Sequence, residues 1–304
     1  MNPDKYLVVI AGPTAVGKTS LSISLAKKLN TVILSADSRQ FYKEIPIGTA
    51  QPSAAELKEV SHYFISSHSI HTPINASQFE KEALTLLDSL FKQHPFVILC
   101  GGSGLYIDAL CNGFDKEMPD ANLKIRAELN DIYQNQGITA LQELLQQKDP
   151  EFYSTVDLQN PKRLLRALEV CLVSGKPYSI LRKGIPNTRP FKIIKIVIAE
   201  ETEELYKKIN ARTETMFQNR LLDEAQKVFA HKNHTPLKTV GYNELFLYFE
   251  NIFSLEKAKE EIKKNTRRYA RRQLTWFRKD KKYTWFKPNQ ADEIVQFIRT
   301  QGHV

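Results

Sequence analysis

Gly12-Pro13-Thr14-Ala15-Val16-Gly17-Lys18-Thr19 fits the phosphate-loop pattern G-x-x-x-x-G-K-[ST]. The run Tyr6–Ala11 before it is typical of a short buried strand, and residues 20–29 after it are typical of a helix. A strand, a glycine-rich turn and a helix start direct backbone N–H groups and the positive end of the helix dipole toward one point. Lys18 adds a full positive charge there, and the Thr19 hydroxyl can bind Mg²⁺. The stretch predicts a site for at least two linked phosphates, which belong to a nucleotide or to another diphosphate.

Length and composition limit the class of protein. The chain has 304 residues, of which 42% are hydrophobic, enough for a main body with an appended or inserted part. No apolar run reaches the roughly 18 residues of a membrane-spanning helix, and Asp4 and Lys5 do not resemble the start of a secretion signal. Cys100, Cys111 and Cys171 lack metal-ligand spacing. We therefore expect a reduced cytoplasmic protein that does not bind membranes. The oligomeric state stays open, with a monomer as the working expectation.

The net charge of +9 is concentrated in one segment. Residues 263–282 contain ten basic residues and one acidic residue, and removing them from the 43 basic and 34 acidic residues of the chain leaves 33 of each. The whole excess of positive charge therefore lies in this segment, which is typical of a surface that binds a polyanion.

The basic segment has the periodicity of a two-sided helix. One half of the helix surface would carry Lys263, Lys264, Arg267, Arg268, Arg271 and Arg272. The other half would carry Ile262, Tyr269, Ala270, Gln273, Trp276 and Phe277. We expect the second half to pack on the body of the protein and the basic half to bind nucleic-acid phosphates. An acidic membrane surface is the weaker alternative, because the aromatic residues are spaced as core contacts.

Strand and helix signals alternate in most of the chain and then give way to helices alone. Further strands are predicted at 31–34, 95–100 and 191–199, and helices at 76–93 and 201–230. Between them, helices are predicted at 121–135, 138–147 and 161–174. We expect an α/β fold in which residues 1–117 and 190–304 form a phosphate-loop NTPase-like core, a parallel sheet with helices on both faces. Residues 118–189 would form an all-helical insertion domain.

Polar residues follow two of the predicted strands, where open α/β sheets bind their ligands. Asp37 follows the strand at 31–34, and Ser103 follows the strand at 95–100 among three glycines. Asp37 would place a carboxylate beside the bound diphosphate, although it could instead be a helix N-cap or an outer-sphere ligand of magnesium. Ser103 would contact the ligand, unless the glycines only form a tight turn.

Arg212 and three histidines are weaker signals. Arg212 lies on the helix predicted at 201–230 and could clamp an anion, although a surface arginine is the commoner case. His62, His68 and His71 have no cysteine or acidic cluster at ligand spacing, so we interpret them as solvated loop residues.

Six motifs, in order along the chain, resemble those of the bacterial tRNA dimethylallyltransferases. They are Gly12–Thr19, Asp37–Gln40, Ile47–Ala50, Gly101–Tyr106, Asn160–Val170 and Thr266–Arg278. The resemblance extends to about Phe286. It implies transfer of the dimethylallyl group from dimethylallyl diphosphate to N6 of the adenosine 3′ to the anticodon, in tRNAs that read codons beginning with U. The second substrate would be the tRNA anticodon stem-loop.

The resemblance also implies roles for individual residues. The phosphate loop would hold the donor's diphosphate with Mg²⁺, Lys18 and Thr19, and Asp37 would be the general base that accepts the N6 proton. Ser103 stands where the family usually has threonine and keeps the hydroxyl. Arg212 completes the predicted catalytic group. The adenine must leave the anticodon stack to react, which predicts a deep channel between the strand ends and the helical insertion.

Positions that contact tRNA in the family are spread over the whole chain. The predicted tRNA contacts are Asp37, Ser38, Arg39, Gln40, Ser103, Arg126, Gln159, Asn160, Pro161, Lys162, Arg163, Lys238, Gly241, Tyr242, Asn243, Arg267, Arg268, Arg271 and Arg272. Three positions depart from the family pattern: Arg220 replaces a common glycine, Asn243 a basic residue, and Lys43 an arginine.

Two other functions share some of these features. A nucleotide or small-molecule kinase would have the phosphate loop and magnesium, but it predicts tight ATP binding and no concentrated basic helix. A non-catalytic RNA-binding protein with a relic phosphate loop would keep its function without Asp37.

Overall fold

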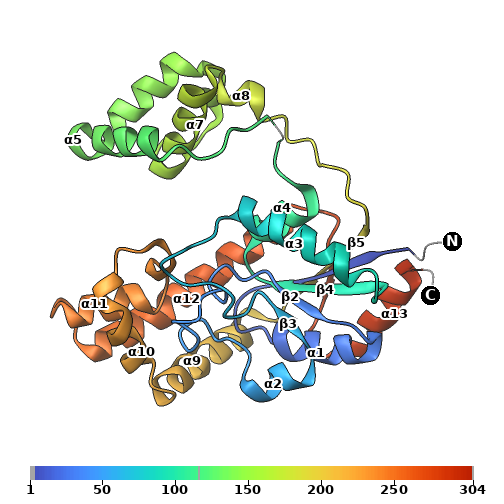
Figure 1. The fold of residues 1–304 in the computed structure, drawn as a ribbon. Coiled ribbons are helices and arrows are strands. Elements are labelled where there is room, and N and C mark those ends of the chain that lie inside the picture. The colour runs from blue at the N-terminus through green and yellow to red at the C-terminus, as the bar shows by residue number, and fades with distance from the viewer. Residues whose placement is uncertain (1–3, 116, 303–304) are drawn as a thin grey trace. The chain divides into compact units, whose positions relative to one another are not determined.

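The computed structural model describes residues 4–115 and 117–302, and its strands form one sheet with helices around it (Figure 1). Its strands are β1 (Tyr6–Ala11), β2 (Ile33–Ser35), β3 (His62–Tyr63), β4 (Phe96–Gly101), β5 (Lys192–Ile198) and β6 (Thr284–Phe286). They are arranged in the order β3-β2-β4-β1-β5-β6, and every pairing between them is parallel. The predicted parallel α/β sheet is confirmed.

Helices connect these strands and extend beyond them. The helices of the sheet-containing unit are α1 (Lys18–Leu29), α2 (Ala54–Glu59), α3 (Ala76–Leu90), α4 (Gly104–Asn112), α9 (Thr202–Gln218), α10 (Leu221–Val228), α11 (Tyr242–Phe249), α12 (Leu255–Arg278) and α13 (Ala291–Gly302), with the short 3-10 helices η1 (Phe229–His231) and η2 (Thr235–Leu237). The insertion contains α5 (Leu123–Lys148), α6 (Pro150–Thr155), α7 (Pro161–Ser174) and α8 (Tyr178–Leu181).

Strand β1 shows why helices cover both faces of the sheet. All six of its residues are apolar or aromatic and at most 2% exposed, and alternate side chains point to opposite faces. Leu7 and Val9 pack in one core cluster with side chains of α3 and α4, whereas Val8 and Ile10 pack in another with side chains of α1, α9 and α13. Burial of each such side chain contributes about 1.5–3 kcal/mol, so both layers of helices stabilise the sheet.

The register of the parallel strands brings three loops together at the carboxyl-terminal ends of the strands. Ala11, the last residue of β1, pairs with Gly101 at the end of β4, and Ser35 at the end of β2 pairs with Cys100. The chain leaves all three strands at this end of the sheet. The phosphate loop, the segment after β2 and the glycine-rich turn after β4 therefore start side by side.

The described residues divide into two compact units. Residues up to 111 together with those from 189 onward form one, and residues 112–188 form the other, whereas the sequence-based expectation put the divisions after 117 and 189. The second unit has its own core, built around Leu129, Leu145 and Leu164. Its first helix, α5, is interrupted at Gly137, where φ is 78°, as the separate helices predicted at 121–135 and 138–147 require.

The single long helix predicted at 201–230 is wrong. The chain forms α9 and α10 instead, with a break at Arg220, whose φ of 70° and ψ of 35° are left-handed. A left-handed residue cannot continue an α-helix, and the conformation favours glycine. The glycine that the resemblance implies at this position would adopt this conformation without strain, whereas Arg220 adopts it at an energetic cost.

Arg220→Gly is expected to increase the free energy of unfolding by about 0.5–1 kcal/mol. The left-handed conformation costs a non-glycine residue about 1–2 kcal/mol, whereas the greater flexibility of unfolded glycine offsets about 0.5–1 kcal/mol of that gain. The lost ion pair between Arg220 and Asp223 is exposed and contributes little. Denaturant unfolding of both proteins measures the difference. Arg220→Ala is the control, because alanine keeps the unfavourable φ, and a glycine variant no more stable than the alanine variant would contradict the explanation.

No helix within the two described stretches is at once long enough and apolar enough to cross a membrane.

Candidate active site and nucleic-acid surface

The phosphate loop folds as a compact turn at the start of α1. Gly17 is left-handed, with φ of 98°, and directly precedes the first helical residue, Lys18. Gly12 allows close approach, because a Cβ atom there would overlap the carbonyl oxygen of Ile198 in β5. The Lys18 ammonium donates to the carbonyl oxygen of Pro13 (2.6 Å), so the side chain folds back over the loop.

Two cations lie at the loop without a carboxylate in ion-pair contact among the described residues. Lys18 is one, and burial lowers its pKa to about 8, although the negative charge of Asp37 acts in the opposite direction. Arg212 of α9 is the other: its guanidinium donates to the Thr14 hydroxyl, and burial lowers its pKa while Asp37 again opposes the shift. Partly buried cations without a bound anion are costly, so their convergence on one loop favours an anionic ligand there. The structure thus brings the predicted clamp, Arg212, to the phosphate loop.

Thr19 is suited to a magnesium ion that a diphosphate carries. It is the second residue of α1, and in the described structure its hydroxyl makes no hydrogen bond to protein. Mg²⁺ usually binds proteins through one or two side-chain oxygens and takes its other ligands from substrate phosphates and water. The free Thr19 hydroxyl beside an anion-binding loop could provide one such side-chain oxygen.

Asp37 lies in the field of both cations, because its charge affects the pKa of Lys18 and of Arg212. Its Oδ1 atom accepts a hydrogen bond from the backbone N–H of Arg39 (3.0 Å). The residues that follow form turns and no helix, so the alternative of a helix N-cap is wrong. One carboxylate oxygen fixes the turn, and the other makes no hydrogen bond within the described chain. A fixed carboxylate with a free oxygen can accept a proton.

Ser103 holds the Asp37 segment in place. It is 9% exposed, its Oγ atom accepts from the backbone N–H of Ser38 (3.0 Å), and its hydroxyl donates to the Ser38 Oγ atom (3.2 Å). Tyr269 of α12 lies close enough to Ser103 and Asp37 for both to affect its pKa. Burial and then the charge of Asp37 raise the pKa of Tyr269 to about 12, so its phenol stays protonated at neutral pH.

Gln273 of α12 ties two loops of the site together. Its Oε1 atom accepts from the backbone N–H of Thr14 (2.9 Å), and its Nε2 atom donates to the carbonyl oxygen of Gly102 (2.9 Å). The residue is 5% exposed. The sequence placed Gln273 on the buried half of the helix but assigned it no role. The available signal was an amide within an otherwise apolar stripe, because a buried amide needs hydrogen-bond partners.

Part of the basic half of α12 faces solvent. Arg268, Arg271, Arg272 and Lys279, with Thr275 and Trp276, line an open groove of about 460 Å³. Arg272 lies over the ring of Tyr269, with 5.7 Å between the guanidinium carbon and the ring centroid. The groove therefore adjoins Tyr269 and also Gln273, which contacts the phosphate loop.

Three expectations for α12 need correction. Lys263 does not point freely outward, because it forms ion pairs with Glu214 and Glu260, both at 2.8 Å. Arg267 instead donates to the side chain of Asn210 in α9 (2.8 Å) and is half-buried. Trp276, expected in the buried half, is 40% exposed, and its indole N–H donates to Asp108 (2.9 Å).

Another predicted tRNA contact, Tyr242, is fully buried, so its side chain has no surface to offer RNA. Its hydroxyl donates to Glu224, which also accepts from the backbone N–H groups of Ile47 and Gly48, each at 2.8 Å. The Ile47–Ala50 motif is thus hydrogen-bonded to Glu224 of α10, which also binds Tyr242 of α11. Lys238 and Asn243 are exposed in the same region, whereas Gly241 is buried.

The insertion presents its predicted contacts around α7. Asn160 caps this helix by accepting from the backbone N–H of Arg163 (3.3 Å), and Pro161 is its first residue. Lys162 and Arg163 are exposed on the first turn, and Gln159 precedes the cap. Their charges lie at the helix N-terminus, which itself favours anions.

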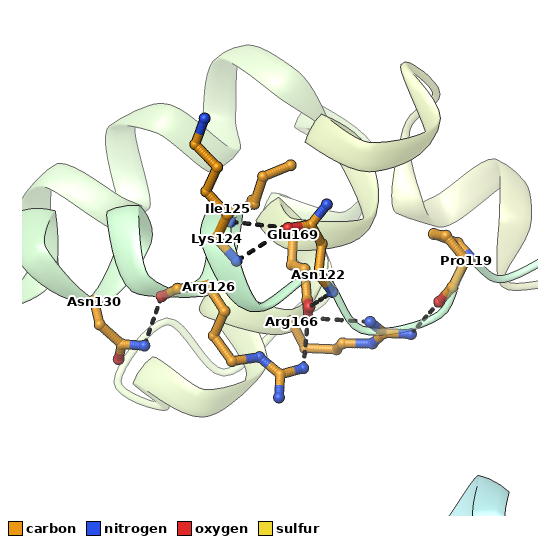
Figure 2. A network of polar contacts seen from close by, with 8 residues as sticks. All are labelled: Pro119, Asn122, Lys124, Ile125, Arg126, Asn130, Arg166 and Glu169. Carbon is orange, nitrogen blue, oxygen red and sulfur yellow. Dashed lines mark hydrogen bonds and ion pairs between the residues drawn. The ribbon is translucent and has the colours of Figure 1, made fainter.

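Arg126 takes part in a polar network within the insertion (Figure 2). It and Arg166 both donate to Oε2 of Glu169, at 2.7 and 3.0 Å, and the backbone N–H of Asn122 donates to Oε1 (2.8 Å). Burial alone would raise the pKa of Glu169, but these hydrogen bonds outweigh it and lower the pKa below its usual value. Glu169 therefore stays ionised and orients Arg126, which is itself 44% exposed at its side chain.

A family model matches most of the chain, and curated relatives match nearly all of it. A family model described as IPP transferase matches residues 40–280. The chain is 50% identical over 290 residues to tRNA dimethylallyltransferase 2 of Azobacteroides pseudotrichonymphae genomovar. CFP2, a match that covers 95% of this chain and 94% of that protein. It is 46% identical over 301 residues to the tRNA dimethylallyltransferase of Flavobacterium johnsoniae, with 97% of each chain covered.

Solved structures agree with these matches. The fold is similar to the full-length tRNA isopentenylpyrophosphate transferase of Bacillus halodurans, with a TM-score of 0.73 and 32% identity over 99% of this chain and 97% of that chain. A eukaryotic dimethylallyltransferase acting on tRNA gives a TM-score of 0.81 over 95% of this chain and 75% of that chain. Its identity is 24%, so this second likeness concerns the fold alone.

Proposed function

Because the chain belongs to the tRNA dimethylallyltransferase family, also described as IPP transferases, we propose that it prenylates tRNA. The donor is dimethylallyl diphosphate. The acceptor is N6 of the adenosine 3′ to the anticodon in tRNAs that read codons beginning with U, and the product is N6-isopentenyladenosine. One observation carries this proposal: Lys18 and Arg212, two partly buried cations without a carboxylate in ion-pair contact in the described structure, both contact the phosphate loop, and the charge of Asp37 acts on both.

The cations fit the leaving group of this reaction. The allylic C–O bond breaks, the diphosphate takes the electron pair, and negative charge grows on its bridging oxygen as the bond lengthens. Lys18, Arg212 and the N–H groups of the phosphate loop would stabilise that charge. The Thr19 hydroxyl would help to hold Mg²⁺, and that ion would supply further positive charge at the leaving group.

Asp37 fits the acceptor side. The N6 nitrogen forms a bond to the allylic carbon and must lose one proton, which the free oxygen of Asp37 would accept. Ser103 would act as a positioning residue, because it holds Ser38 and thereby the turn that presents the carboxylate. Serine in place of threonine keeps both hydrogen bonds.

The kinase alternative lacks support at two points. Strand β4 ends at Gly101 and is followed by Gly102, so its end supplies no carboxylate for the magnesium of a nucleotide. In addition, Gln273 of the basic helix contacts the phosphate loop directly, an arrangement that suits delivery of RNA to the bound donor.

Nucleoside analysis tests the proposal. The protein is incubated with bulk tRNA and either dimethylallyl diphosphate or ATP, and the digested nucleosides are analysed by mass. We expect N6-isopentenyladenosine with the allylic donor and no product with ATP. Transfer from ATP without transfer from the allylic donor would establish the kinase instead.

Replacing Arg268 and Arg272 together by alanine is expected to weaken tRNA binding and flatten its salt dependence. Each lost phosphate contact lowers the salt slope of log Kd by about one, and both side chains line the exposed groove of α12. Binding measured over a range of salt concentrations checks this. Arg299→Ala, an exposed arginine on α13, is the matched control. If the double variant showed the same salt dependence of log Kd as the control, the groove would not bind tRNA phosphates and would only be exposed to solvent.

We further propose a monomeric protein of the cytoplasm. Three free cysteines, two of them buried, support a reducing compartment.

A further inference from the structure

Three histidines from distant parts of the chain meet at one point. His71 lies in the loop before α3, His231 ends η1, and His234 directly precedes η2. Their ring centroids form a triangle with sides of 4.6, 5.2 and 5.2 Å. One nitrogen from each ring lies within 4.8 Å of the corresponding nitrogens of the other two. We propose that these three side chains form a binding site for a transition-metal ion, with Zn²⁺ as the expected occupant.

The hydrogen bonding of His234 prepares it as a ligand. Its Nδ1 atom lies 3.2 Å from the carbonyl oxygen of Ile70. A carbonyl only accepts hydrogen bonds, so Nδ1 carries the proton, and Nε2 of the neutral ring presents its lone pair. Histidines that ligate metals usually have such a partner on the other nitrogen, which fixes the ring and its tautomer.

The ligand set selects the class of metal. Imidazole nitrogens suit zinc, copper, nickel and iron, whereas magnesium and calcium prefer oxygen. Zinc-to-nitrogen bonds of about 2.0–2.1 Å place ligand nitrogens of a tetrahedral site about 3.3 Å apart, so the rings must rotate inward slightly. His71 is exposed and free to do so. Three histidines leave a fourth position for water.

The basic residue next to the cluster in sequence has a compensating partner. Lys232 is adjacent to His231 in sequence, but it forms an ion pair with Glu250 and lies over the ring of Phe229. Its charge is thereby compensated.

A metal here would fasten together two segments of the candidate site. The chain just before His71 pairs with the segment that follows Asp37, because the N–H of His68 donates to the carbonyl of Phe41 (2.8 Å). The chain after His234 leads to Lys238 and the start of α11. The bound ion would therefore hold the loop behind the general base against a segment expected to contact RNA, which makes its role structural.

Metal titration tests the site directly. Tag-free, full-length protein is stripped with a chelator, dialysed and titrated with Zn²⁺, and with Mg²⁺ in parallel. We expect one Zn²⁺ per chain and no binding of Mg²⁺ at the same position. His71→Ala should lower zinc affinity more than about 100-fold, because even loss of a group behind a ligand costs about 10–100-fold. His71 is exposed, so this variant should fold normally.

His94→Ala is the matched control, because His94 also has its Nδ1 near a backbone carbonyl, that of Asn30 (3.1 Å), but lies outside the cluster. Zn²⁺ should raise the unfolding temperature of the wild type and of this control, and should not raise that of His71→Ala. The proposal would be overturned if zinc binding were not saturable, or if one-to-one binding survived His71→Ala. The three histidine rings would then only pack against one another.

Discussion

Asp37→Asn is expected to lower kcat by about 10²–10⁴-fold, the usual contribution of a general base, and to leave tRNA affinity within a few-fold. Asparagine keeps an oxygen that can accept from the backbone N–H of Arg39, so the turn is preserved while the proton acceptor is lost. Single-turnover rates of nucleoside formation and tRNA binding, both measured at about pH 7, separate the two effects. The choice of pH matters because Asp37 supports the charge of Lys18, whose pKa would fall further without it.

Asp37→Glu provides the matched control for this result. It restores a carboxylate, although displaced by one methylene group, and should recover part of the lost rate. An asparagine variant with full turnover would remove Asp37 as the base and favour a non-catalytic role. Equal loss of turnover in both variants would point to the turn geometry as the main contribution of this residue.

Lys18→Ala is expected to reduce kcat by about 10²–10³-fold, the usual cost of removing one donor to a developing anion. The variant should also raise the KM for dimethylallyl diphosphate, because it removes a full charge from the phosphate loop. Its stability should not fall, since the deleted ammonium is a partly buried charge without a carboxylate in ion-pair contact in the described structure. Steady-state kinetics against donor concentration check the first two effects, and thermal unfolding checks the third.

The control for Lys18 lies on the same helix. Lys27 of α1 is exposed and forms an ion pair with Glu59, so Lys27→Ala should leave the kinetics unchanged. A Lys18 variant with wild-type KM and kcat would show that the loop does not hold the leaving group.

The lowered pKa of Lys18 also gives a direction to the pH dependence. Burial lowers it to about 8, so in the free protein the ammonium loses its proton, and with it the attraction for the donor, as the pH rises through that value. Donor affinity should therefore fall above about pH 8. Lys18→Arg keeps its charge in this range, so any donor binding that it retains should not show the same fall.

The sheet and the phosphate loop were predictable because their signals are local. The glycine and lysine spacing specifies an anion-binding turn, and continuous apolar runs specify strands that are buried on both faces. Gly137 likewise marked the break within α5, because glycine is a visible helix breaker. Each of these features depends on residues that are close together in sequence.

Features that depend on distant partners were not predictable in this way. Arg220, between α9 and α10, is left-handed, although arginine itself does not favour that conformation and so does not mark the break. Tyr242 looked available to RNA, but its burial depends on Glu224 and on Gly48, which is almost two hundred residues away. His71 is an exposed loop residue as predicted, but its ring contacts with His231 and His234 were not visible because these partners lie 160 and 163 residues further along the chain.

Helix α12 has a mechanical consequence for how the two substrates are aligned. Arg272 faces the open groove, and its immediate neighbour Gln273 grips the amide of Thr14 in the phosphate loop. In the proposed reaction, one helical turn would therefore fix the distance between the RNA backbone at the groove and the leaving group at the phosphate loop. Deleting one residue from this turn would then misalign nucleophile and electrophile even if each substrate still bound with its normal affinity.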